Sequence, residues 1–165
     1  MDFTTYLNAW LKSEITQGRI MIGLGILGLV ALYGILRSQH ELLRGTIVPF
    51  SLLLLVLIGY GSYILVSRPA HARASTARYE AAPSEAIATE RAKHVNDNRA
   101  GKTLLRYVYP LLILLGGGAL LFLGSPHYRG VAIGVIFLAA AAYVIDYGFV
   151  SRSDAFIAFL DTLRN

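Results

Sequence analysis

Residues 67–103 read SRPAHARASTARYEAAPSEAIATERAKHVNDNRAGKT and form the long polar stretch between two strongly apolar halves of the chain. Alanine is abundant in this stretch, and Pro69 and Pro83 suit the first turn of a helix, so we expect a helical connector. Two apolar segments of about membrane-spanning length lie on each side of it. The chain is therefore predicted to be a hairpin, a basic connector and a second hairpin. The basic residues of the connector are Arg68, Arg73, Arg78, Arg91, Lys93, Arg99 and Lys102.

The composition favours a membrane protein. A soluble domain of 165 residues, 55% of them hydrophobic, would have to bury more apolar side chains than its volume holds. The net charge of +5 does not indicate nucleic acid as a partner, because the basic residues follow the apolar segments instead of forming one basic face. The chain has no cysteine, and its four histidines are scattered. We therefore predict the lipid bilayer as a partner, and no metal, cofactor or nucleic acid.

The predicted fold is an all-α integral membrane protein with four transmembrane helices arranged as two repeated hairpins. Amphipathic helices are expected at both termini. The cytoplasmic connector between the two hairpins is also expected to be helical. The spans are predicted at 20–36, 46–66, 104–123 and 131–150. The predicted parts are an amphipathic interfacial helix (1–18), the first transmembrane hairpin (19–66), the basic cytoplasmic connector (67–103), the second transmembrane hairpin (104–150) and an amphipathic C-terminal tail (151–165).

Both terminal segments have apolar residues at spacings of three and four, which is typical of amphipathic helices. We expect the first to lie in the headgroup region with Trp10 as its anchor, and a partner-binding helix is the alternative. In the tail, Ser153 is the expected helix cap. The apolar residues are Phe3, Tyr6, Leu7, Trp10, Leu11 and Ile15 at the start of the chain, and Phe156, Phe159, Leu160 and Leu163 at its end.

The distribution of basic residues predicts the orientation in the membrane. The chain has 15 lysines and arginines, and only Arg37, Arg44 and Arg129 lie in the short turns between spans. Basic residues prefer the cytoplasmic side of a membrane. We therefore expect a multi-pass protein of the cell (inner) membrane, with both termini and the connector in the cytoplasm.

The two hairpins share short sequence motifs, which predicts an internal repeat. Residues 38–40 and 125–127 read SQH and SPH, and each is followed shortly by Arg-Gly at 44–45 and 129–130. The second and fourth spans both end in Val-Ser-Arg, at 66–68 and 150–152. The hairpins enter the membrane from one side, so this would be a parallel repeat. Chance matching in a biased alphabet is the alternative.

The sequence contains stretches that match all or part of two nucleotide-binding motifs, but their surroundings argue against nucleotide binding. Residues 23–28 read GLGILG, but a dinucleotide fingerprint works only at a turn from strand to helix, and these residues lie within a predicted span. Residues 101–103 read GKT without the glycine that a phosphate loop needs five positions earlier. The glycines of 23–28 are instead expected to allow close packing of helices.

Asp146 is the charged residue that lies deepest within a predicted span, and it is the main candidate for a functional site. Arg106 enters the third span from the same side, so we expect Asp146 to lie within reach of Arg106 or of one of the basic groups of the connector. A structural pair and a proton or ion relay are the two interpretations. The candidate polar site consists of Asp146, Arg106, Tyr143, Tyr147, Tyr60 and Tyr63. A separate candidate for helix packing is the stripe of Gly130, Gly134, Ala141 and Gly148.

Three function classes remain open on sequence grounds. The first is a non-enzymatic scaffold that forms homo-oligomers or serves as an accessory subunit of a membrane complex. The second is a small oligomeric ion or proton channel, or a transporter, that uses Asp146. The third is a membrane enzyme acting on lipid, which is disfavoured because no dense set of acids and histidines shares one depth. We predict no catalytic residues, and the ligand is not identified by any motif.

Overall fold

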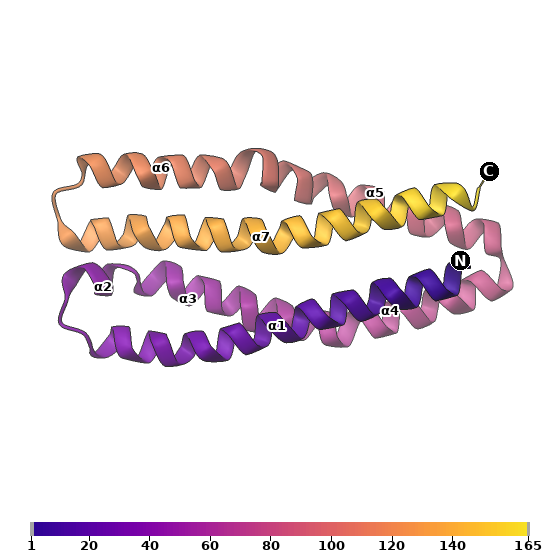
Figure 1. Cartoon of the computed structure of the whole chain (residues 1–165), viewed down its shortest axis with the longest axis horizontal. Coiled ribbons are helices and arrows are strands. Elements are labelled where there is room, and N and C mark those ends of the chain that lie inside the picture. The colour runs from indigo at the N-terminus through magenta and orange to yellow at the C-terminus, as the bar shows by residue number, and fades with distance from the viewer. Residues whose placement is uncertain (1, 165) are drawn as a thin grey trace.

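The computed structural model describes residues 2–164 and is helical throughout apart from short turns (Figure 1). Two π-helical turns, η1 (Val56–Tyr60) and η2 (Leu104–Val108), join successive helices without a break. The continuous helical stretches therefore run Phe3–Arg37, Ile47–Ala81, Pro83–Phe122 and Pro126–Thr162. The α-helices are α1 (Phe3–Arg37), α2 (Glu41–Gly45), α3 (Ile47–Leu55), α4 (Gly61–Ala81), α5 (Pro83–Thr103), α6 (Tyr109–Phe122) and α7 (Pro126–Thr162).

All four long helices are long and apolar enough to cross a membrane. This confirms the predicted all-α protein with four candidate spans, and it suggests a lipid bilayer as the setting. Both described ends of the chain and the turn between α4 and α5 lie at one end of the molecule, called here the polar end (Figure 1). The turns after α1 and after α6 lie at the opposite end, called the loop end.

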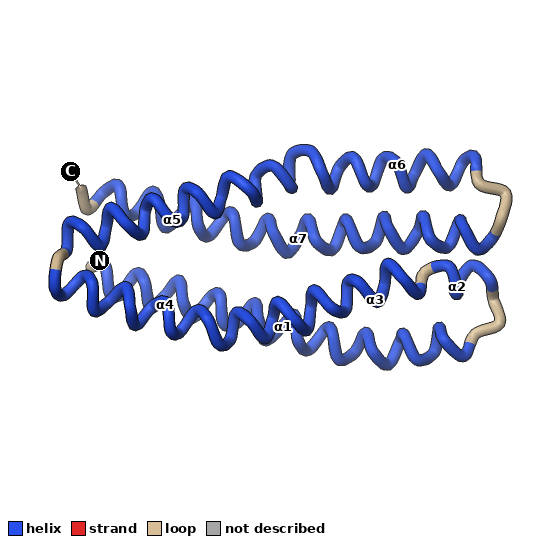
Figure 2. The backbone as a smooth tube through the Cα atoms, turned by 180° about the vertical axis from the view of Figure 1, so that it is seen from behind, coloured by secondary structure: helices blue, strands red, loops and turns tan. Residues whose placement is uncertain are grey.

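In the half toward the loop end, the helices follow the order α1, α3, α7, α6 (Figures 1 and 2). Each helix packs on its neighbours in this row. Large apolar side chains on the outer faces, such as Leu114 of α6 and Val30 of α1, are exposed. An apolar exterior is what a helix needs where lipid surrounds it.

The contact between α2 and α7 is made backbone to backbone. A Cβ atom on Gly130 would collide with the carbonyl oxygen of Leu42, and one on Gly45 would collide with that of His127. Gly134 lies one turn further along α7, where a Cβ would collide with the Pro49 ring of α3. Glycine at these positions lets α7 approach α2 and α3 closely.

The terminal segments differ from the prediction of separate interfacial helices. They are the continuous ends of α1 and α7, and they pack with α4 and α5 as a bundle at the polar end. Trp10, the expected headgroup anchor, is 5% exposed within this bundle. The apolar faces of the four helices cover one another, so they form a core instead of lying along a membrane surface. That core consists of Phe3, Leu7, Trp10, Ala72, Ile87, Phe156 and Leu160.

The internal repeat stays a prediction. Gly45 and Gly130 occupy corresponding places in it and lie against each other across the α2–α7 contact. The π-helical turns, however, interrupt the second and third long helices, which the repeat does not relate. The connector of 67–103 is helical except at Ala82, where α4 gives way to α5. Met1 and Asn165, the outermost residues of the predicted terminal segments, lie outside the described residues.

Candidate functional site

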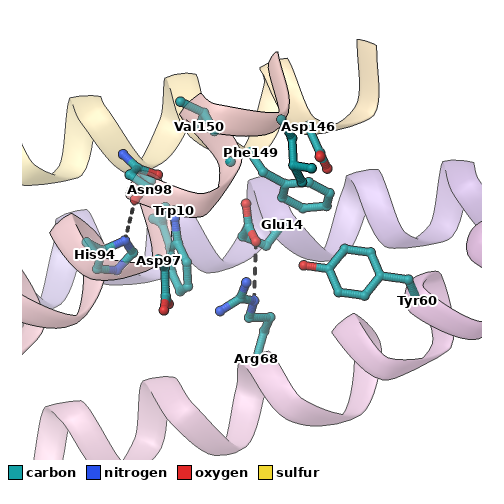
Figure 3. A pocket seen from close by; sticks show the side chains of 13 residues that line it. Trp10, Glu14, Tyr60, Arg68, His94, Asp97, Asn98, Asp146, Phe149 and Val150 are labelled. Atoms are coloured by element: carbon teal, nitrogen blue, oxygen red, sulfur yellow. Dashed lines mark hydrogen bonds and ion pairs between the residues drawn. The ribbon is translucent and has the colours of Figure 1, made fainter. Parts of the chain in front are cut away.

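A polar cavity of about 220 Å³ lies where the apolar half of the molecule meets the polar bundle. All four long helices contribute to it, and Figure 3 shows the side chains that line it. The π-helical turns border it, since Tyr60 ends η1 and Leu104 begins η2. The cavity is lined by Trp10, Glu14, Tyr60, Arg68, His94, Asp97, Asn98, Gly101, Leu104, Asp146, Phe149, Val150 and Ser153.

Glu14 of α1 is the most buried carboxylate beside this cavity, with 2% of its surface exposed. Arg68 of α4 brings its Nε to 3.3 Å from Glu14 Oε2. Arg152 of α7 donates from Nε to Glu14 Oε1 at 2.9 Å, and its second nitrogen lies at the same distance from that oxygen. One buried acid therefore joins three helices, and Figure 3 shows Glu14 and Arg68 pointing toward each other.

The two arginines also contact aromatic rings. The guanidinium of Arg68 lies 5.4 Å from the Trp10 ring centre, and that of Arg152 lies 5.1 Å from the Phe149 ring centre. Both distances are within the range of cation–π attraction. Arg152 additionally donates to the side-chain oxygen of Gln17, whose amide nitrogen donates to the Ile145 carbonyl at 3.1 Å. These contacts hold α1, α4 and α7 together at the boundary.

His94 of α5 borders the cavity on the side of the polar bundle. Its Nδ1 lies 2.7 Å from Ser153 Oγ of α7, while its buried Nε2 has no hydrogen-bond partner among the described residues. Trp10 packs edge-on against the imidazole, at 5.3 Å between ring centres. Burial lowers the pKa of His94 to about 4, because the charged form loses its hydration there. The imidazole is therefore neutral near neutral pH.

Glu90 lies one helical turn before His94 and is 1% exposed. Ser75 Oγ donates to Glu90 Oε1 at 2.6 Å, and His71 Nε2 lies 3.0 Å from Oε2. Burial alone would raise the pKa of Glu90, but these two hydrogen bonds, together with electrostatic attraction from the neighbouring histidines, outweigh it and leave the pKa below its ordinary value. This second buried carboxylate joins α5 to α4.

Exposed ion pairs add further contacts between α5 and α7. Lys102 Nζ and Asn98 Nδ2 donate to Asp154 Oδ1 at 2.7 and 2.8 Å. Arg91 Nε donates to Asp161 at 2.5 Å, which lowers the pKa of that carboxyl. Solvated pairs of this kind stabilise a protein only slightly.

Asp146 lines the cavity, but its partner is not the predicted arginine. The hydroxyl of Tyr109 donates to Asp146 Oδ2 at 2.5 Å. Arg106 lies within η2, with its guanidinium 5.3 Å from the Tyr107 ring centre, and it lines a different cavity beside Lys102. Tyr109 begins α6 just beyond η2 and reaches the carboxylate from the same helical stretch that was expected to supply Arg106.

The predicted tyrosines form two separate groups. Tyr60 and Tyr63 stack with ring centres 6.0 Å apart, and Tyr143 and Tyr147 stack at 6.4 Å. Tyr60 lines the cavity together with Asp146, whereas the other three tyrosines lie outside its lining. Of the predicted polar site, only Asp146 and Tyr60 line this cavity.

The stripe of small residues on α7 faces other helices of the same chain. Gly130 and Gly134 lie against α2 and α3, as described above. Ala141 packs on an apolar cluster that includes Met21 and Leu53. A Cβ on Gly148 would lie 3.2 Å from the side-chain oxygen of Gln17. The contacts of the stripe are thus intramolecular.

Glu14, Arg68, His94 and Arg152 are the site residues that sequence reasoning missed. For Glu14 a signal was present, because it follows Trp10 by four positions on the buried stripe of α1 and precedes Gly18 by four. A glutamate on an apolar stripe indicates a buried partner. Residues 2–164 contain no cluster of histidines and acids suited to a metal ion.

Comparison with known proteins found no relative of this chain. No family model, no curated protein and no solved structure matches this chain. The class is therefore defined by the fold and the site alone: an all-α protein with four candidate spans and a buried ionic network at the boundary of a polar bundle.

Proposed function

We propose that this protein is a non-enzymatic scaffold or accessory subunit of a membrane complex, with both termini and the α4–α5 hairpin in the cytoplasm. The observation that carries the proposal is the clamp of Glu14 between Arg68 and Arg152. A buried carboxylate that faces the guanidinium groups of two partly exposed arginines joins their helices, and removing the carboxylate is costly. The clamp therefore supports a rigid bundle that projects from the membrane.

The proposed orientation follows from charge. The polar end carries most of the basic residues, and Arg37, Arg44 and Arg129 are those near the loop end. If the protein lies in the inner membrane of a cell, the positive-inside rule favours an orientation with the polar end in the cytoplasm. The bundle would then offer its outer surface to cytoplasmic or membrane partners, including further copies of the chain.

The test of the scaffold is the size of the native assembly. Extraction into nanodiscs formed directly from the membrane, followed by mass measurement, should give a particle that contains several copies of the 18.0 kDa chain or a stoichiometric membrane partner. Glu14→Gln, which loosens the bundle, should shift this assembly to smaller sizes. A single copy without a companion in such nanodiscs would contradict the proposal.

A channel or transporter is the second candidate, and a specific observation favours it. Asp146 and Glu14 line one polar cavity, and Asp97 on its rim is exposed to solvent. Ionisable groups that face a common cavity in a membrane protein are often parts of ion or proton paths. In liposomes under a proton or cation gradient, a channel would show flux that Asp146→Asn alters and that Val30→Ala, on the outer face of α1, leaves unchanged. A scaffold would show none.

A further inference from the structure

An apolar groove of about 670 Å³ opens between α1 and α7 in the half toward the loop end. Its floor is α3, since α1 and α7 both pack on α3 in this half (Figures 1 and 2). Leu24 and Leu27 of α1 and Val144 of α7 line the groove while remaining exposed. These helices are candidate membrane spans, so the surroundings of the groove are acyl chains and not water.

An open depression of about 490 Å³, called here the mouth, lies beside this groove on the side of the polar end. Gln17 and Ile20 line both spaces, so the two adjoin. The further residues around this mouth are small, hydroxylated or basic: Ala9, Lys12, Ser13, Thr16 and Arg152. No carboxylate lines it, which leaves the mouth with two positive charges and two hydroxyl groups.

The charge balance around the mouth is positive. Arg152 is paired with Glu14, but that single carboxylate also neutralises Arg68. Lys12 is exposed on α1, one helical turn from Thr16. Arg152 is partly exposed, with 25% of its side chain accessible, and it reaches the mouth from the opposite wall. A negatively charged group placed between Lys12 and Arg152 would be attracted by both.

We propose that this site binds one phospholipid with an anionic headgroup, whose acyl chain lies in the groove and whose phosphate lies between Lys12 and Arg152. The volume of the groove falls in the range of about 300–1,000 Å³ that is usual for small-molecule sites. Basic pockets between membrane helices at the cytoplasmic boundary are suited to anionic lipid headgroups. The inference does not depend on the scaffold function, because lipid occupancy is measured apart from assembly.

The first arm of the test fills the groove. Val144 and Val30 are each 70% exposed, but only Val144 lines the groove. The variants Val144→Trp and Val30→Trp therefore add the same side chain at positions of equal exposure. Native mass spectrometry of protein in detergent, titrated with phosphatidylglycerol, should show a severalfold loss of bound lipid for Val144→Trp alone. Equal retention by the two variants would overturn the proposal.

The second arm removes charge from the mouth. Lys12→Gln should reduce the preference for phosphatidylglycerol over phosphatidylcholine about fivefold, the effect of one basic residue near an anionic bilayer surface. Arg73→Gln removes the same charge from an exposed position within α4, outside the lining of the groove and the mouth, and should leave the preference unchanged. An equal effect of both variants would mean that net charge alone attracts the lipid, which would overturn the site.

The third arm separates a bound lipid from a soluble anion and from lipid spread over the whole apolar surface. Glycerol phosphate in large excess should not displace phosphatidylglycerol, because the groove contributes the contacts of the acyl chain. A phospholipid with a photoactivatable acyl chain should crosslink to Leu24, Leu27 or Val144. Displacement by glycerol phosphate, or crosslinks spread evenly over the outer faces of α1 and α6, would overturn the proposal.

Discussion

Glu14 shows how one residue can hold several helices at the boundary between apolar and polar surroundings. Its carboxylate is 2% exposed and contacts two arginines from different helices. Replacing it by glutamine would leave both guanidinium groups without a counter-charge in a partly desolvated place. We expect Glu14→Gln to lower the free energy of unfolding by about 3 kcal/mol.

The control for this prediction is Glu41→Gln, since Glu41 is exposed in α2 at the loop end. Unfolding in mixed detergent micelles, followed by circular dichroism, should show a large loss for Glu14→Gln and a change within about 0.5 kcal/mol for Glu41→Gln. Similar losses for the two variants would contradict the clamp.

His94 predicts a specific dependence of stability on pH. Its pKa is lowered from 6.5 to about 4 by burial, so the unfolded chain binds a proton between these values that the folded chain does not. The stability that neutral His94 provides is complete above pH 6.5 and is lost as the pH falls toward 4. The free energy of unfolding should therefore rise with pH in this window, with a slope approaching about 1.4 kcal/mol per pH unit.

The lowered pKa of Glu90 acts in a separate range. Glu90 provides stability above its ordinary pKa of 4.5, and this stability is lost as the pH falls through its lower folded value. Melting curves between pH 5 and 6.5 thus isolate His94 from Glu90. His94→Gln should flatten the slope there, while His127→Gln, at the exposed loop end, should keep it. A slope that His94→Gln leaves intact would assign the effect to another group.

At the scale of the element, Gly130 of α7 and Gly117 of α6 differ in what surrounds them. A Cβ on Gly130 would meet the backbone of Leu42 and Gly45, which cannot move aside as a flexible side chain could. A Cβ on Gly117 would meet nothing within 4 Å. We expect Gly130→Ala to destabilise the protein by about 1–3 kcal/mol. Gly117→Ala should be neutral or stabilising by up to about 1 kcal/mol, because alanine favours helix.

The same unfolding assay checks this contrast, with a Gly117→Ala, Gly130→Ala double variant as a test of independence. The two glycines lie on different helices without shared partners, so their effects should add. Loss of stability in Gly117→Ala would show that the outer face of α6 is covered by another molecule in the assembly, which the single chain does not reveal.

Sequence reasoning could predict the helices but not where their apolar faces lie. The continuous apolar segments and the Pro83 helix start both follow from local pattern and appear in the structure. The apolar residues near each terminus form equally clear stripes, yet a stripe does not say whether lipid headgroups or other helices cover it. Trp10 could therefore be read as a membrane anchor, although it packs in the bundle.

The candidate site was only partly predictable for the same reason. Asp146 stands out because a charge within an apolar span is conspicuous, whereas its partner depends on the turn of the helix around η2. A π-helical turn shifts which residues share a face, and no local sequence pattern marked its position. Tyr109 therefore meets the carboxylate in place of Arg106.

At the scale of the whole molecule, the two halves arrange their apolar side chains in different ways. Toward the loop end the helices lie in a row with apolar outer faces, and toward the polar end four helices enclose an aromatic core (Figure 1). The ionic network lies where one arrangement changes into the other. At this boundary, charged side chains can pack against aromatic rings and counter-charges and still remain close to the water that surrounds the polar end.

The orientation of the whole molecule gives the last prediction, and a chain without cysteine is well suited to testing it. Single cysteines at Gln39 and Gly124 would report the loop end, and one at Ser84 would report the turn between α4 and α5; all three positions are exposed. If the positive-inside rule holds, a membrane-impermeant maleimide should label Gln39→Cys and Gly124→Cys in intact cells or spheroplasts. Ser84→Cys should react only after the membrane is permeabilised. The reverse pattern would place the basic bundle outside the cell, and it would contradict the cytoplasmic orientation proposed for the scaffold.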